Sequence, residues 1–163
     1  MILVLIGVSG SGKTTIGTLL AQRSGAIFAD ADDYHSQANK AKMAAGLPLH
    51  DEDRMPWLGT LNKLMRGWSE CGESAVLACS TLKQIYRDIL INGLPKEAVT
   101  FVWLDGSREL IAERLAVRNH DFMHAGLLDS QMAILEPPPD AFRLVNDRHP
   151  EEIVDEILRN VSL

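Results

Sequence analysis

An eight-residue segment near the start of the chain has the pattern of a nucleotide phosphate loop. Residues 7–14 read Gly-Val-Ser-Gly-Ser-Gly-Lys-Thr, a complete G-x-x-x-x-G-K-S/T motif. Glycines let such a loop turn tightly, so that its backbone N–H groups converge on phosphate oxygens. The motif lysine reaches the β- and γ-phosphates, and the motif hydroxyl holds Mg²⁺. The predicted nucleoside triphosphate site therefore comprises Gly7, Val8, Ser9, Gly10, Ser11, Gly12, Lys13 and Thr14, with Thr14 also at the metal.

The alternative is a flexible Gly/Ser loop that matches the motif by chance. Residues 2–6 form a short apolar run typical of a buried strand, and apolar residues at helical spacing follow between Thr15 and Arg23. A strand before the loop and a helix after it are the context that confirms this motif. The helix also adds its positive N-terminal end. We therefore favour a phosphate-binding loop.

A second group of reactive side chains lies in the acidic segment 30–35, which reads Asp-Ala-Asp-Asp-Tyr-His. Asp30 and Asp32 are two residues apart, so both face one side if the chain is extended there. A magnesium–nucleotide site needs a carboxylate for the metal or its waters, and a kinase needs an acceptor for the hydroxyl proton. We predict that Asp30 holds the metal through water and that Asp32 is the base.

Three neighbours of these carboxylates have less specific roles. Asp33 or Ser36 is expected to cap a helix over residues 37–45, because both residue types accept a hydrogen bond from a helix N-terminus. For His35, a hydrogen bond to a substrate and a contact that stabilises the turn are both open from the sequence.

Cationic side chains with possible binding roles follow further along the chain. Arg54 carries a planar guanidinium that can bind a carboxylate at two points, although its residue type alone favours a surface ion pair with the neighbouring acids. Lys83 is predicted in a first helical turn, with Ser80 as cap. A cation there is electrostatically unfavourable and indicates an anionic partner. Arg87 lies one turn further on the same face.

Two arginines precede a polar, irregular segment at 119–124. Arg114 and Arg118 are four residues apart and so project from one face of a predicted helix. Arginines that a lid brings to the site can neutralise charge on a transferring phosphoryl group. Two solvated arginines on an exposed helix are the alternative.

The elements that must position these residues alternate along the chain. Short apolar runs predict strands at 2–6, 26–29, 74–79, 99–104 and 142–145, and amphipathic segments predict helices at 52–70, 82–91, 108–117 and 151–161. This alternation is typical of an α/β fold with a mainly parallel sheet covered on both faces. Ligands bind beyond the carboxyl ends of such strands, where the phosphate loop and the acidic segment are expected.

Composition narrows the class of protein. The 163 residues predict a single domain, 1–163, with 46% hydrophobic and 23% charged residues. The net charge of −6 and the lack of a basic stripe argue against nucleic acid, and no apolar stretch is long enough to span a membrane. Cys71 and Cys79 have no metal-type spacing and predict reduced thiols of a cytoplasmic protein.

Several of these segments together resemble the gluconokinase family of small phosphate-loop kinases, and the resemblance covers nearly the whole chain. The phosphate loop is common to many enzymes, whereas three further motifs are more specific: D-x-D-x-x-H at 30–35, D-x-D-R-x-P-W at 51–57 and C-S-x-L-K at 79–83. Leu135-Glu136-Pro137 also matches. The resemblance implies transfer of phosphate from ATP, with Mg²⁺, to gluconate.

The resemblance also implies roles and a fold. Arg54 would bind the substrate carboxylate, with Lys83 and Arg87 in the same pocket, while Arg114 and Arg118 would bind ATP. The catalytic residues would be Lys13, Asp32 and Arg118. The implied fold is the P-loop NTPase fold of the nucleoside monophosphate and shikimate kinases. It has a five-stranded parallel sheet in the order 2-3-1-4-5 and a mobile lid over about 114–136, and family members commonly form homodimers.

Some positions depart from the family pattern. Thr81 and Gln84 replace an alanine and a lysine after the Cys-Ser pair, and residues 119–123 replace a Gly-His-Phe run, so His120 receives no role. One rival function is another small-molecule kinase of this fold, such as a shikimate kinase, which has a Gly-rich loop in place of C-S-x-L-K. The other rival is a regulator that binds nucleotide without catalysis.

Overall fold

The structure is a computed structural model that describes residues 1–117 and 125–163. Its centre is a parallel sheet of five strands in the order β2-β3-β1-β4-β5, which confirms the predicted fold class. The strands are β1 Ile2–Ile6, β2 Ile27–Asp30, β3 Ala75–Ala78, β4 Val99–Asp105 and β5 Phe142–Val145. All five strands were predicted to within one residue at each end.

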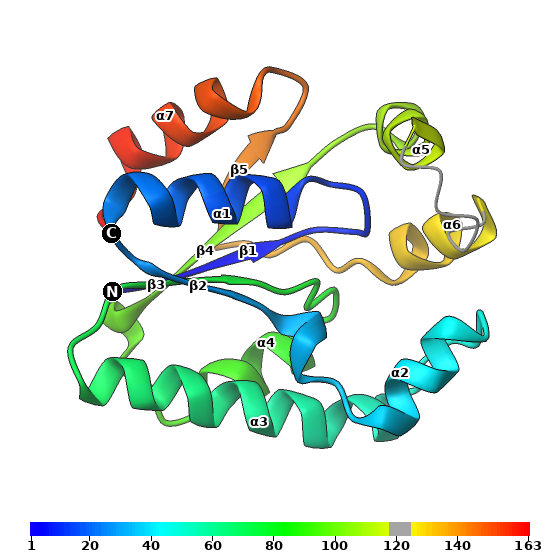
Figure 1. Cartoon of the computed structure of the whole chain (residues 1–163), viewed down its shortest axis with the longest axis horizontal. Helices are drawn as coiled ribbons and strands as arrows, with labels where there is room; N and C mark the ends of the chain where they lie inside the picture. The colour runs from blue at the N-terminus through cyan, green and yellow to red at the C-terminus, as the bar shows by residue number, and fades with distance from the viewer. Residues whose placement is uncertain (118–124) are drawn as a thin grey trace.

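Helices cover both faces of the sheet (Figure 1). They are α1 Lys13–Ser24, α2 Gln37–Ala44, α3 Asp51–Glu70, α4 Gln84–Ile91, α5 Arg108–Val117, α6 Ala125–Ile134 and α7 Pro150–Asn160, with short 3₁₀ turns at Ala31–Tyr34 and Lys96–Ala98. None of the helices in the described part of the chain is long and apolar enough to cross a membrane.

The alternation of side chains along β1 shows how the two layers form. Ile2 and Val4 face α3 and α4, where Trp57, Leu61, Met65 and Leu90 complete one apolar cluster. Leu3 and Leu5 face α1 and α7 on the opposite side, in a cluster with Leu20 and Ile153. Because both faces of the strand are buried, β1 is a continuous apolar run rather than an alternating one.

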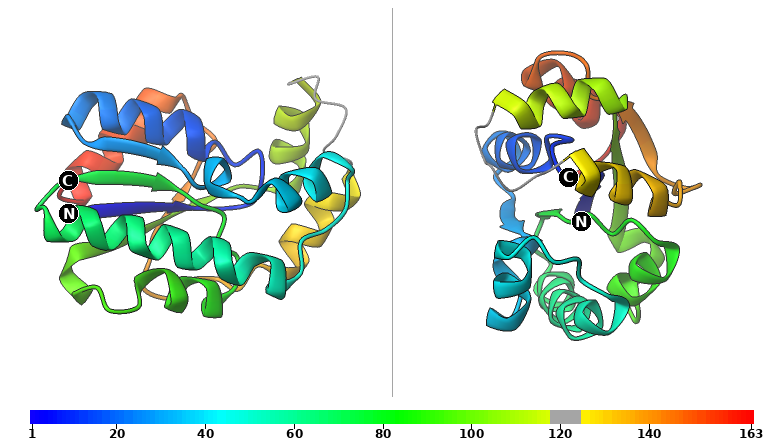
Figure 2. Two further views of the ribbon diagram at one scale, coloured as in Figure 1. Left: turned by 60° about the horizontal axis from the view of Figure 1, so that its bottom comes forward. Right: turned by 90° about the vertical axis from the view of Figure 1, so that its right-hand side faces the viewer.

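The carboxyl ends of the strands point toward one end of the molecule, where α2, α5 and α6 extend beyond the sheet (Figures 1 and 2). A small third cluster of Val8, Leu82, Ile111 and Leu128 joins α5 and α6 to the loops that follow β1 and β3. The candidate residues predicted at strand ends therefore meet at this end of the molecule.

Two local predictions were wrong. The helix after β3 begins at Gln84 with Lys83 as its N-cap, not at Leu82 with Ser80 as cap. Thr81, just before it, has a φ of 28°, which a β-branched residue rarely adopts and which interrupts the helix there. The second concerns α6, which was not predicted as a helix, because the family resemblance describes this region only as a lid.

Candidate active site

The phosphate loop lies between β1 and α1, as its motif predicts. Gly10 and Gly12 have φ values of 82° and 95°, in the left-handed region that favours glycine. The side-chain amide of Asn146, at the end of β5, donates to the Ser11 carbonyl at 2.7 Å. A Cβ atom on Gly12 would lie only 2.5 Å from that amide nitrogen. The loop therefore keeps its shape through glycine and through a buried amide from another strand.

A cavity of about 280 Å³ opens over this loop. Lys13 lines it, and its ammonium group donates to the carbonyl oxygens of Gly7 at 2.9 Å and Val8 at 3.0 Å. The start of α1 borders the same space, so the helix N-terminus and the ammonium group both place positive charge there. This cavity is suited to a polyphosphate.

Thr14 and Asp30 form the predicted metal-binding pair. The Thr14 hydroxyl donates to Asp30 Oδ2 at 2.8 Å, and both residues line the cavity. Across residues 1–117 and 125–163, no group of three histidine, cysteine or acidic side chains could hold a metal ion. One hydroxyl and one carboxylate fit Mg²⁺ that arrives with a nucleotide, because this ion keeps several waters and takes its other ligands from phosphates.

Asp32 lies where two cavities meet. It lines the phosphate cavity and also a larger cavity of about 940 Å³ that extends toward α2, α3 and α6. Burial by the surrounding cleft and the charge of Asp30 raise the pKa of Asp32. Its side chain still exposes 78% of its surface to water, so desolvation is moderate, and the neighbouring carboxylate acts in the same direction. Asp32 can therefore face both a phosphate and an acceptor.

His35 is buried beside Asp32. Its ring stacks on Trp57 with the ring centroids 4.2 Å apart and the planes at 14°, and Nδ1 lies 3.3 Å from Asn39 Nδ2. Burial, together with the positive charges of Arg54 and Lys40, lowers the pKa of His35 to about 4. The imidazole is therefore neutral at physiological pH. It also lines the larger cavity, so neither of the two predicted roles is excluded by its position.

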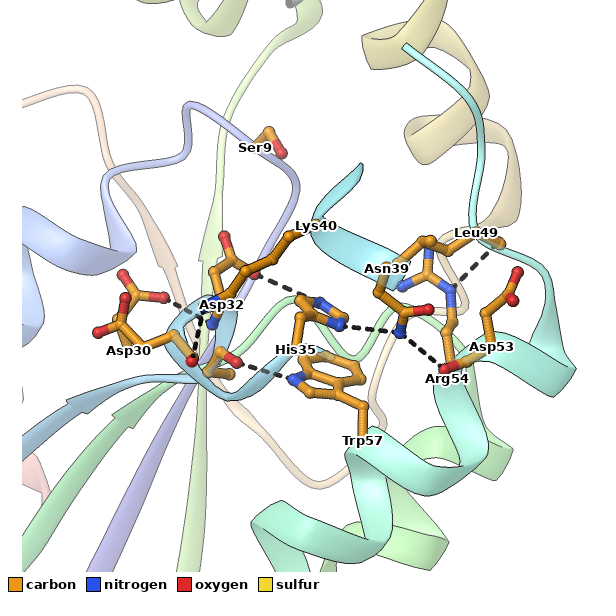
Figure 3. A network of polar contacts seen from close by, with 12 residues as sticks. Ser9, Asp30, Asp32, His35, Asn39, Lys40, Leu49, Asp53, Arg54 and Trp57 are labelled. Carbon is orange, nitrogen blue, oxygen red and sulfur yellow. Dashed lines mark hydrogen bonds and ion pairs between the residues drawn. The ribbon is translucent and has the colours of Figure 1, made fainter. Parts of the chain in front are cut away.

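Arg54 projects into the larger cavity from the first turns of α3 (Figure 3). Its Nε donates to the Leu49 carbonyl at 3.4 Å, and its guanidinium carbon lies 5.5 Å from the centroid of the Tyr86 ring. In the described part of the chain, no carboxylate forms an ion pair with this guanidinium. The surface ion pair considered from the sequence is not formed.

Two acids close to Arg54 in sequence, Asp51 and Asp53, are paired with other groups. Asp53 accepts from Lys42 Nζ at 2.7 Å and from the His50 backbone N–H at 3.0 Å, and these two bonds hold its pKa below the usual range. Asp51 accepts hydrogen bonds from Tyr86 and from Lys83, which lower its pKa in the same way. Arg54 therefore lines the cavity while the carboxylates of Asp51 and Asp53 are bonded to other groups.

Lys83 lines the same cavity as predicted, 3.0 Å from Asp51. Its hydrogen bond with Asp51 raises the pKa of the ammonium group. Lys83 thus shares its charge with Asp51, whereas Arg54 forms no ion pair with a carboxylate in the described part of the chain.

Arg87 is not among the residues that line the larger cavity, although the family resemblance implies a place for it in the substrate pocket. Its side chain is buried, and its guanidinium donates to the carbonyl oxygens of Thr81, Leu82 and Glu136 and to Gln84 Oε1. These bonds join the loop after β3 to the segment that follows α6. The position and hydrogen bonds of Arg87 are those of a residue that stabilises the wall of the site.

This role predicts a stability defect. Arg87→Met is expected to lower the free energy of unfolding by about 2–4 kcal/mol, because two buried carbonyl groups and one partly buried carbonyl group lose a charged donor. Urea unfolding monitored by circular dichroism measures the loss, and Arg159→Met on the exposed face of α7 is the matched control. A stable Arg87 variant with a greatly raised KM for its acceptor would contradict this assignment.

Arg114 lies on the nucleotide side of the loop. With Gly10, Gly12 and Arg148 it lines a separate cavity of about 490 Å³, and its guanidinium donates to the Asn146 carbonyl. This position fits the predicted contact with ATP. Arg118, predicted as its partner and as a catalytic residue, and His120 lie outside the described residues.

Gln131 on α6 was missed from the sequence. Its Oε1 accepts from the Ser9 backbone N–H at 2.7 Å, and its Nε2 lies 3.1 Å from Ser9 Oγ. A residue of α6 thus contacts the phosphate loop. A sequence signal for the helix was present, because Leu128, Met132 and Leu135 are apolar residues at helical spacing. In the structure Leu128 is buried, and Met132 and Leu135 pack against the same cluster. Asn39 was also missed, because no motif includes it.

Comparisons with known proteins agree with this geometry. A family model described as an AAA domain matches residues 2–138. Gluconokinase of Gluconobacter oxydans is 44% identical over 97% of this chain and 89% of its own length. A probable gluconokinase of Dictyostelium discoideum is 43% identical over 96% of this chain and 84% of its own length. The crystal structure of a gluconokinase from Sinorhizobium meliloti superposes with a TM-score of 0.86 at 38% identity, covering 96% of this chain and 89% of the other.

These similarities extend over nearly the whole chain and include the phosphate loop and the segments that line the larger cavity. With this degree of identity and coverage, the chain belongs to the gluconokinase family.

Proposed function

We propose that this protein transfers the γ-phosphoryl group of ATP to the terminal hydroxyl of gluconate and releases ADP and 6-phosphogluconate. The observation that carries the proposal is the position of Asp32 between two cavities, one with a phosphate loop and one with Arg54. A carboxylate at the junction is suited to a hydroxyl, and an arginine without a carboxylate partner in the described chain is suited to an acidic substrate.

On the nucleotide side, the loop amides and Lys13 would hold the β- and γ-phosphates. Thr14 and, through water, Asp30 would hold Mg²⁺, which neutralises part of the phosphate charge when it is bound. Arg114 would contact the nucleotide from the other side of the loop, and we propose that Arg118 assists the transfer from a lid over about 114–136. The region of the lid that the structure describes already contacts the loop through Gln131.

On the acceptor side, Arg54 would bind the gluconate carboxylate and thereby set which hydroxyl faces the γ-phosphate. Asp32 would orient that hydroxyl and accept its proton as the oxygen attacks phosphorus and the bond to ADP breaks. Lys83 and His35 would line the acceptor pocket, whereas Arg87 is not part of it. Kinases of this kind depend mainly on positioning and on charge stabilisation.

The assignment is tested by incubating the purified chain with ATP, Mg²⁺ and gluconate. Coupled ADP release and ³¹P NMR of the product should show a phosphate monoester on the primary carbon. Preference for shikimate would support the rival kinase. ATP binding by calorimetry without ADP release from any acceptor would support the non-catalytic regulator.

Arg54 provides a prediction about substrate class. Arg54→Lys is expected to raise KM for gluconate roughly tenfold to a hundredfold, because a point charge cannot replace two parallel hydrogen bonds worth about 1.5–3 kcal/mol. KM for ATP should change little, as measured by steady-state kinetics with each substrate varied. Arg66→Lys, on the exposed face of the same helix, is the matched control. An unchanged KM for gluconate would show that Arg54 does not bind the carboxylate.

Two coarser expectations complete the proposal. We propose a single 1–163 domain that works in the cytoplasm, which is supported by two cysteines that form no disulfide. Burial raises the pKa of the Cys79 thiol to about 12, so that thiol is unreactive. We also propose a homodimer, as the family resemblance implies, and light scattering on the purified chain tests it.

A further inference from the structure

Asn39 is a buried residue with an amide whose orientation is fixed by its surroundings. Its Nδ2 lies 2.8 Å from the backbone carbonyl oxygen of Asp53 and 3.3 Å from His35 Nδ1. A carbonyl oxygen can only accept a hydrogen bond, so the NH₂ group and not the oxygen of Asn39 must face Asp53. The second N–H of the same group then points at His35.

This orientation determines which nitrogen of His35 carries the proton. Nδ1 receives a hydrogen bond from Asn39 and must therefore be unprotonated, which leaves the proton of the neutral ring on Nε2. Nε2 lies 3.9 Å from Asp32 Oδ1, at the junction of the two cavities (Figure 3). Arg54 and Lys40 add positive charge nearby, and with burial they keep the ring neutral.

We propose that Asn39 fixes His35 as the Nε2–H tautomer, and that His35 is a positioning residue which donates to Asp32 and aims that carboxylate at the acceptor hydroxyl. The inference rests on the proposed role of Asp32 in the kinase reaction. His35 cannot itself be the base, because its unprotonated nitrogen faces Asn39 and not the cleft. A neutral donor also leaves Asp32 more basic than an imidazolium would.

The surroundings hold the ring but leave Asp32 able to move. His35 stacks on Trp57, whose Nε1 donates to the carbonyl of Ala31 at 2.7 Å, so the stack is joined to the residue just before Asp32. The Asp32 backbone N–H donates to Asp30 Oδ1 at 3.1 Å. The proposal therefore requires that the exposed Asp32 side chain rotates so that the 3.9 Å between its Oδ1 and His35 Nε2 shortens to a hydrogen bond.

The tautomer can be measured without any substrate. Long-range ¹H–¹⁵N spectra of the full chain at about pH 7 distinguish a protonated ring nitrogen from an unprotonated one. The signals of His35, one of five histidines, are assigned by their loss in His35→Gln. In the native protein we expect His35 Nε2 to be protonated and Nδ1 to be unprotonated. In Asn39→Leu we expect a mixture of the two tautomers of His35, because leucine cannot donate a hydrogen bond to Nδ1. An Nδ1–H tautomer or an imidazolium in the native protein would overturn the proposal.

Two substitutions at His35 test the donor itself. Glutamine can place an amide N–H near the position of Nε2, whereas asparagine reaches only the position of Nδ1. His35→Asn is expected to lower kcat about threefold to tenfold, the worth of one hydrogen bond, with KM for gluconate nearly unchanged. His35→Gln should recover most of that loss. Thermal unfolding of both variants checks that the fold is retained.

The kinetic outcomes separate the possible roles. Equal loss of kcat in the two variants would show that the ring only packs, and a rise in KM alone would show that it contacts the substrate. Either result overturns the positioning role. Turnover of gluconate by the native protein tests the proposed function separately, so failure of that function and failure of the tautomer assignment are distinguishable.

Discussion

Lys13→Ala is expected to lower kcat by roughly 10²- to 10³-fold, as removal of a group that stabilises transition-state charge does in other enzymes. The ammonium group lines the phosphate cavity and donates to the carbonyl oxygens of Gly7 and Val8 in the loop. ADP release with saturating ATP and gluconate measures the effect. The melting temperature should change little, because the side chain contributes to none of the three apolar clusters.

Lys63→Ala is the matched control for this prediction, since Lys63 is an exposed lysine on α3 that lines none of the cavities described above. It should retain normal turnover. Near-normal turnover in the Lys13 variant would mean that residues 7–14 are not the catalytic ATP site.

Asp32→Asn is expected to lower kcat by about 10²-fold or more while leaving ATP affinity nearly unchanged. The amide keeps the size of the side chain but cannot accept the hydroxyl proton. Steady-state kinetics and calorimetric titration with ATP measure the two quantities separately. The variant removes the one carboxylate that lines both cavities.

Asp33→Asn is the control for Asp32, because the neighbouring carboxylate is exposed and lines neither of these two cavities. It should have a much smaller effect. Ser36, and not Asp33, caps α2 by accepting from the Asn39 N–H at 3.1 Å. Equal defects in the two aspartate variants would show that the base has been assigned to the wrong residue.

The strands and the ends of the sheet were predictable because their signals are local. Each strand is a short apolar run between polar segments, and a parallel sheet brings the carboxyl ends of its strands to one edge. The phosphate loop, Asp30 and Asp32 are at or just beyond the carboxyl ends of their strands. Once the order of the strands is given, these residues are expected to lie close together, as they do around the phosphate cavity.

The roles of the arginines were not predictable from residue type, because they depend on contacts between distant segments. Arg54 is without a carboxylate partner in the described chain, and Lys42 from α2 and Lys83 from the loop after β3 pair instead with Asp53 and Asp51. Arg87 is on the expected helix, but its guanidinium donates to the backbone carbonyl of Glu136, 49 positions away in the sequence. Helical spacing predicts on which face of a helix a residue lies, but it does not predict which other segment packs against that face.

The central claim is that an acidic polyol is the acceptor, and the most direct test is the ratio of kcat/KM for gluconate to that for the neutral polyol of the same length. Coupled ADP release with both acceptors measures it in one experiment. We predict a ratio of roughly ten to a hundred or more, because only gluconate offers Arg54 a carboxylate. Equal values for the two acceptors would contradict the account and reopen the substrate class.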